Sequence, residues 1–356
     1  MKFTKEDTKI IKGAAICLML YHHLFGYPDR LLEGVSFVSL CSFGGIPLSI
    51  YIGQFGRICV PMFLFLSGYG IYISSEKSEN VRAMTFRRVR GLYKQMWQVF
   101  FLALPFSLWV NRWKGASLIP ETILNGLSLE CSFNEEWWFI LPFAVLLLLF
   151  PAMKRFLDRK NADLYTELLV LLLYSVFYNY IVPGFFSAFS LSGFEKSAVW
   201  HRMNELLLVF PAFFLGCIFA KYGILDRIKK DCAGKPAWCI LSLVGMGAVF
   251  YLRLYNHMFY DFVNGAVLVM CLTVLLPLRI LQWPFRILKK LAEESTFMWL
   301  THTFFCYYWC QRLVYAPRCS LLIFAFLVAL SYAAAKCIRF FWKTASRLVH
   351  KEAERR

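Results

Sequence analysis

Apolar residues occur in long runs along this 356-residue chain. A helix needs about 20 mainly apolar residues to cross the hydrocarbon core of a bilayer. Ten segments approach that length, at residues 10–25, 58–75, 95–110, 137–151, 164–182, 206–220, 237–252, 259–277, 292–311 and 319–337. Hydrophobic residues make up 59% of the chain, against about 45–50% in average proteins, which excludes two soluble domains or a disordered chain. The pattern predicts an all-α, polytopic membrane bundle of about ten transmembrane helices.

The basic residues are spread unevenly over the segments that connect these runs. Of the 39 lysines and arginines, 30 fall in one alternate set of segments, which includes both termini. Those segments are residues 1–12, 76–94, 152–163, 221–235, 279–291 and 336–356. Because cytoplasmic loops carry the excess of lysine and arginine, both termini are predicted to be cytoplasmic. We expect one transmembrane domain over residues 1–342, a basic cytoplasmic tail over 343–356, and an interfacial or re-entrant piece at 37–54.

The net charge of +17 therefore reports membrane topology and not a nucleic-acid partner. No basic stretch alternates with aromatic residues as a base-stacking surface would. The expected surroundings are the lipid bilayer of a plasma membrane, which the chain crosses several times.

The first apolar run begins with a lysine and ends with two histidines. At 100° per residue, His23 lies about 20° past three full turns from Lys12, so the two side chains share a helix face. They are about 16 Å apart along the helix axis, and His22 points about 80° away from Lys12. Ionisable residues inside a span are costly and mark functional sites. Histidines that merely end a span at the membrane interface would give the same pattern.

The second run contains two small residues, Ser67 and Gly68, among bulky apolar ones. Such residues either allow two membrane helices to approach closely or leave a slot for an extended ligand. A basic stretch that includes Arg87 and Arg88 follows this run. It either obeys the positive-inside rule and binds anionic lipid, or it forms a phosphate site, since arginine grips phosphate well.

Two acidic residues precede the fourth run. Glu135 and Glu136 stand in a predicted outer loop, where either carboxylate can orient or polarise a histidine. Trp138 follows them and fits the aromatic belt at a membrane interface. We therefore expect this loop to contribute to a site on the outer side.

Further candidates lie in the eighth and ninth runs. Trp299 and His302 share a helix face, where a packed histidine bonded to a neighbouring helix is the alternative to a binding site. His257 and Asp261, four residues apart, either meet a polar acceptor or form a simple pair at a helix end. No histidine has cysteine or carboxylate partners at metal-site spacing, so no metal is expected.

These features occur together in an order that resembles the acyltransferase 3 family of integral membrane acyltransferases. The matching segments are Lys12 with His23 after ten further residues, residues 65–69, residues 87–94, residues 137–139, residues 213–216 and residues 299–302. The resemblance covers nearly the whole chain. At position 12 the family carries arginine, so lysine keeps the charge here but lacks the planar fork of the guanidinium.

The resemblance implies transfer of an acyl group, expected to be acetyl, from cytoplasmic acyl-CoA to a hydroxyl of a carbohydrate or lipid-linked sugar at the outer face. This activity would modify polysaccharide in a bacterial cell envelope. The expected catalytic residues are His22, His23 and Glu136. The expected acyl-CoA-binding residues are Lys12, Arg87, Arg88, Ser67 and Gly68. The expected acceptor-binding residues are Trp138, Trp299, His302 and Asp261.

In this scheme His23 is the general base, acting directly or through an acyl-histidine. Two other functions stay open. The first is a transporter of a polar or anionic solute, since intramembrane histidines and small residues are also typical of that class. The second is an inactive family member, and lysine in place of arginine at position 12 would be consistent with lost activity.

Overall fold

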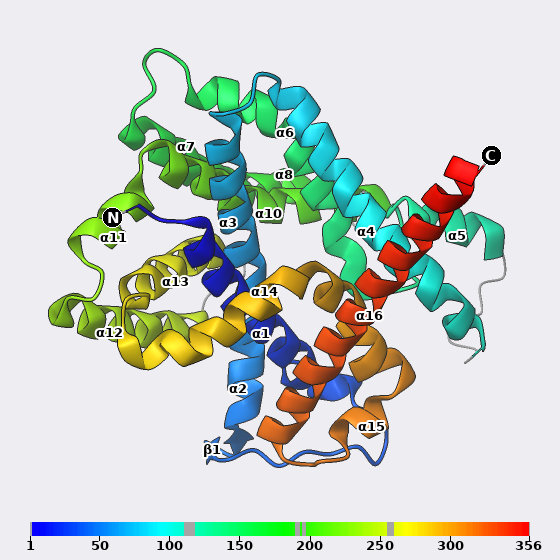
Figure 1. Cartoon of the computed structure of the whole chain (residues 1–356). Coiled ribbons are helices and arrows are strands. Elements are labelled where there is room, and N and C mark those ends of the chain that lie inside the picture. The colour runs from blue at the N-terminus through cyan, green and yellow to red at the C-terminus, as the bar shows by residue number, and fades with distance from the viewer. Residues whose placement is uncertain (1, 110–117, 189–192, 194–196, 255–259, 356) are drawn as a thin grey trace. The chain divides into compact units, whose positions relative to one another are not determined.

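The structure is a computed structural model, and it describes residues 2–109, 118–188, 193, 197–254 and 260–355. These residues are helical almost throughout (Figure 1), which confirms the predicted all-α class. Among them, the only strands are β1 (Ser42–Phe43) and β2 (Ile46–Pro47), which pair as an antiparallel hairpin. The chain forms two compact units, named here unit 1 and unit 2.

Unit 1 consists of Met1–Ala15, Ile58–Arg90 and Phe139–Arg286. Its elements are the first parts of α1 (Lys5–Phe25) and α4 (Val81–Trp109), together with α3 (Cys59–Ser75), α6 (Ile140–Leu157), α7 (Leu164–Val176), η4 (Phe177–Ile181), α8 (Val182–Ala188), α10 (Ala198–Lys221), α11 (Ile224–Asp231), α12 (Pro236–Arg253), α13 (Asp261–Leu275) and η6 (Arg279–Leu281). Helices α3 and α10 approach closely because a glycine on each faces the other. A Cβ on Gly68 would lie 2.0 Å from the carbonyl oxygen of Phe213, and one on Gly216 would lie 2.1 Å from that of Phe65.

Unit 2 consists of Ile16–Arg57, Gly91–Trp138 and Ile287–Arg356. Its elements are the remaining parts of α1 and α4, together with η1 (Pro28–Arg30), α2 (Leu48–Phe55), η2 (Gly56–Ile58), α5 (Leu118–Gly126), η3 (Glu135–Phe139), most of α14 (Gln282–Thr303), η7 (Phe304–Trp309), α15 (Gln311–Tyr315) and α16 (Ser320–Arg355). The ring of Tyr21 on α1 packs 5.2 Å from that of Phe324 on α16. The hydroxyl of Tyr315 donates to the carbonyl of Leu24 and fixes the end of α1.

Among the described residues, six helical stretches are long and apolar enough to cross a membrane, and the protein is accordingly a multi-pass membrane protein in contact with lipid. They are Leu48–Ser75, Glu135–Leu157, Leu164–Phe185, Val199–Lys221, Pro236–Arg253 and Ser320–Leu348. A seventh results if α13 and the stretch Arg279–Trp309, bent by 110°, count as one broken span. The expected total of about ten spans and the cytoplasmic location of the termini stay predictions.

The number of candidate spans, six or seven instead of the predicted ten, has a physical cause. Helices α1 and α4 form where spans were predicted, but both carry charged residues at one end, and α1 adds His22 and His23 at the other. These polar side chains lower the mean hydropathy of the helix. The predicted spans 95–110 and 259–277 each have one terminal residue, 110 and 259, outside the described residues. The predicted interfacial piece at 37–54 contains the hairpin and α2, which continues through η2 into α3 as the candidate span Leu48–Ser75.

Candidate active site

The end of α1 is held against α2 by close backbone packing. A Cβ on Gly53 would lie 2.5 Å from the backbone nitrogen of Gly26, so only glycine fits at this contact. His22 Nδ1 lies 2.7 Å from the carbonyl oxygen of Gly53, and because a carbonyl only accepts, Nδ1 must donate. His22 thus ties α1 to α2 and sets the orientation of the last turn of α1.

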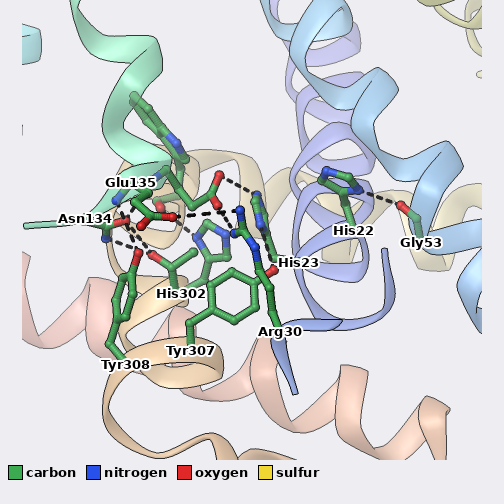
Figure 2. Close-up of polar contacts among 12 residues, drawn as sticks. His22, His23, Arg30, Gly53, Asn134, Glu135, His302, Tyr307 and Tyr308 are labelled. Atoms are coloured by element: carbon green, nitrogen blue, oxygen red, sulfur yellow. Dashed lines mark hydrogen bonds and ion pairs between the residues drawn. The ribbon is translucent and has the colours of Figure 1, made fainter. Parts of the chain in front are cut away.

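The neighbouring His23 is buried, with 8% of its surface exposed, and lies between two polar side chains (Figure 2). Its Nδ1 lies 3.3 Å from the hydroxyl oxygen of Tyr307. Its Nε2 lies 3.7 Å from Oε2 of Glu136. Each ring nitrogen therefore faces a group that can exchange or stabilise a proton.

Glu136 is itself held by Arg30. The guanidinium Nη1 lies 2.6 Å from Oε1, while Oε2 faces His23. Partial burial lowers the pKa of Arg30, but the hydrogen bond and negative charge of Glu136 outweigh that effect and raise the pKa above its ordinary value. Arg30 also stacks over the rings of Tyr27, at 4.5 Å, and Tyr307, at 5.2 Å. A permanent cation therefore fixes and partly neutralises the carboxylate that faces His23.

The loop that carries Glu136 is anchored on α14 by side-chain hydrogen bonds. Asn134 Nδ2 donates to Oγ1 of Thr303 at 2.8 Å, and Thr303 Oγ1 lies 3.1 Å from Oδ1 of Asn134. Trp137 Nε1 donates to the carbonyl of Leu300 at 3.1 Å. Asn134 Oδ1 also accepts from the backbone nitrogen of Glu136 at 3.1 Å, which caps η3. Buried polar groups satisfied in this way hold a side chain in one position.

A second buried histidine lies beside His23. The ring of His302 is fully buried, and its centroid lies 4.8 Å from that of His23. Immediately after His302, α14 widens into the π-helix η7, which carries Tyr307. Such π-helical turns occur frequently at functional sites. Within the described part of the chain, no group of three or more histidine, cysteine, aspartate or glutamate side chains is placed to hold a metal ion.

Unit 2 brings together six of the predicted residues. They are His22, His23, Glu136, Trp138, Trp299 and His302. Trp138 is half-buried in η3, and the carbonyl oxygen of Trp299 accepts a hydrogen bond from His302.

The predictions missed four residues that shape this site. They are Arg30, Asn134, Thr303 and Tyr307. A signal existed for Arg30, which is one of only nine lysines and arginines outside the predicted cytoplasmic segments. No sequence signal marks the π-helix that places Tyr307.

The other predicted residues belong to unit 1. Asp261, at the start of α13, pairs with Arg253, whose Nε lies 2.8 Å from its carboxylate. This ion pair differs from the His257–Asp261 pair considered from the sequence, which stays a prediction. His257 lies outside the described residues.

The predicted donor-binding cations also lie in unit 1. Lys12 is half-buried, and Arg88, which is exposed, donates from Nη2 to Ser74 Oγ at 2.9 Å. Among the residues that the structure covers, neither cation has a carboxylate within ion-pair distance. Arg87 is exposed. Positive charges without a carboxylate partner are suited to an anion.

Of the two small residues on α3, Gly68 lies in close contact with α10. The open side of Gly68 is filled by the backbone of α10, and Cys217 Sγ donates to the Gly68 carbonyl at 3.4 Å. Ser67, beside it, is half-buried. At Gly68, close helix packing accounts for the small residue.

Comparison with known proteins shows the family of the chain. The family model described as "Acyltransferase domain", Acyl_transf_3, matches residues 8–338, which include all twelve predicted site residues. No curated protein and no solved structure gives a significant match. The matched region covers nearly the whole chain, from the first turns of α1 to the middle of α16. The chain therefore belongs to the acyltransferase 3 family.

Proposed function

We propose that the protein transfers an acetyl group from cytoplasmic acetyl-CoA to a hydroxyl of a carbohydrate or lipid-linked sugar at the outer face of a bacterial cytoplasmic membrane. One observation carries the proposal. Within the region that the acyltransferase family covers, buried His23 lies between a carboxylate and a hydroxyl.

The arrangement suits His23 to act as a general base. The ionised carboxylate of Glu136 only accepts hydrogen bonds, so it favours a proton on Nε2 of His23 and leaves the lone pair on Nδ1. In this state the Tyr307 hydroxyl donates to Nδ1. An acceptor hydroxyl that takes the place of the Tyr307 hydroxyl would transfer its proton to Nδ1, while Glu136 stabilises the imidazolium.

The transfer step balances with these groups alone. As the proton moves to Nδ1, the acceptor oxygen forms a bond to the carbonyl carbon of the thioester. The carbon–sulfur bond then breaks, and the sulfur of CoA takes the proton from His23. An ester and free CoA leave the site, and His23 is neutral again.

The donor would be held by Lys12 and Arg88. Neither cation has a carboxylate partner among the described residues. The phosphates of CoA would supply the negative charge to pair with them. Lys12 and His23 belong to the single helix α1 and are separated by about 16 Å of helix rise. The extended arm of CoA is comparable in length to this rise along α1.

The experiment is acyl transfer by the purified protein in lipid nanodiscs. Acetyl-CoA is supplied with a panel of sugars and sugar lipids, and mass spectrometry follows free CoA and acetylated acceptor. One CoA released for each ester formed supports the proposal. Release of CoA with no acceptor at all, or solute counterflow in proteoliposomes without any CoA release, contradicts it, and counterflow favours a transporter.

A further inference from the structure

The buried imidazole of His302 has no role in the chemistry proposed above. Its Nδ1 lies 2.7 Å from the carbonyl oxygen of Trp299 and 3.2 Å from that of Met298. Both oxygens belong to the preceding turn of α14 and can only accept, so Nδ1 must carry the ring proton. In the neutral ring, Nε2 is then left with a lone pair.

That lone pair is buried and unused. Nε2 of His302 has no hydrogen-bond partner within the described residues, and the whole side chain is buried. A buried acceptor without a partner costs free energy and calls for an explanation, and a catalytic or binding role is one that fits a position beside His23. The adjacent ring of His23, with its centroid 4.8 Å away, places this acceptor beside the proposed base (Figure 2).

The protonation state of the ring determines what can bind there. An unprotonated nitrogen accepts from an O–H or N–H group and is repelled by carboxylate, phosphate and thioester oxygens. The partner is therefore a group with an O–H or N–H, and a sugar-type acceptor, with several hydroxyls near the reacting one, supplies such a group beside His23. Since the reacting hydroxyl is directed to His23, the group at His302 is a second one on the same molecule.

We propose that His302 Nε2 is a fixed hydrogen-bond acceptor for a second hydroxyl, next to the one that is acylated. His302 then selects acceptors with neighbouring hydroxyls and positions the reacting oxygen against His23. This inference rests on the proposed function for the identity of the reacting hydroxyl. A site built to bond a hydroxyl discriminates strongly against the analogue that lacks it.

Two substitutions test the roles of the two ring nitrogens of His302 separately. In His302→Asn, the side-chain amide can still donate to the carbonyls that Nδ1 meets, but nothing replaces Nε2. In His302→Gln, the amide reaches the position of Nε2 and its oxygen supplies an acceptor. The probes are trans-1,2-cyclohexanediol and cyclohexanol, which differ by one neighbouring hydroxyl.

The first measurement is kcat/KM for acetyl transfer to each probe. We expect the wild type to prefer the diol by at least about tenfold, His302→Asn to fall to the roughly twofold statistical preference, and His302→Gln to recover most of the discrimination. A twofold preference in the wild type, or an unchanged preference in His302→Asn, overturns the inference. A merely structural role would lower the rates with both probes and leave their ratio unchanged.

The second measurement needs no turnover. In protein labelled with ¹⁵N-histidine, the Nε2 resonance of His302 is assigned by its loss in His302→Asn. We expect an unprotonated Nε2 whose resonance shifts with the diol and not with 1,2-dimethoxycyclohexane, which has no donor. A protonated Nε2, or no shift with the diol, overturns the inference even if acetyl transfer occurs. A shift without transfer to any acceptor contradicts the proposed function and supports donor binding at His302.

Discussion

Replacing Glu136 with glutamine removes the negative charge that faces His23 and keeps the size of the side chain. At an effective dielectric constant of about 20, a unit charge 3.7 Å from protonated His23 contributes about 4.5 kcal/mol. Complete loss of that term corresponds to about 10³-fold in kcat. Arg30, 2.6 Å from the other carboxylate oxygen, cancels part of the charge. We therefore expect kcat to fall between about tenfold and 10³-fold in Glu136→Gln.

The assay is acceptor-dependent release of CoA at saturating acetyl-CoA. Glu135→Gln is the matched control, because Glu135 carries the same charge one residue earlier but its side chain is 66% exposed and lies 3.9 Å from Arg30. The control is expected to stay within about twofold of the wild type, since exposed ion pairs contribute little. A Glu136→Gln protein as active as this control would refute the assignment of Glu136 as the group that stabilises protonated His23.

Three further predictions concern the surroundings of the site. A Cβ at Gly53 would lie 2.5 Å from a backbone nitrogen just after α1, so Gly53→Ala should lower stability by about 1–3 kcal/mol and reduce activity. Gly91 has open space around it, so the control Gly91→Ala should not lower the Tm. Lys12→Ala should raise KM for acetyl-CoA by about tenfold or more with a smaller effect on kcat, and Lys12→Arg should keep the wild-type KM. Both values are measured from the rate of transfer at increasing acetyl-CoA concentration. Arg30→Met should leave the carboxylate of Glu136, whose side chain is 12% exposed, without its cation and lower kcat. Arg30→Lys should recover part of the rate in the same assay.

The parts of the fold that follow from local pattern were predictable from the sequence. Apolar runs of sufficient length form helices in a membrane, so most predicted spans coincide with observed helices. The periodicity of α1 placed Lys12 and His23 on one helix, and one of the two acidic residues before the fourth run, Glu136, lies 3.7 Å from His23.

The rest of the site depends on tertiary contacts that have no local signature. Arg30 stands in a loop after α1, and only the fold shows that its guanidinium reaches Glu136. Tyr307 faces His23 because α14 changes into a π-helix, which residue periodicity does not encode. The sequence left the role of Gly68 open between close packing and a ligand slot, and only the position of α10 shows which backbone occupies the space beside it.

The most direct measurement compares acceptor-dependent CoA release by His23→Ala and His201→Ala in nanodiscs. His201 is a suitable control because its side chain is 72% exposed and it belongs to unit 1, where it pairs with Glu205 at 3.3 Å. We expect a loss of about 100-fold or more for His23→Ala, at an unchanged Tm, and wild-type rates for His201→Ala. A His23→Ala protein that releases CoA within threefold of the wild-type rate would contradict the role of His23 as the base.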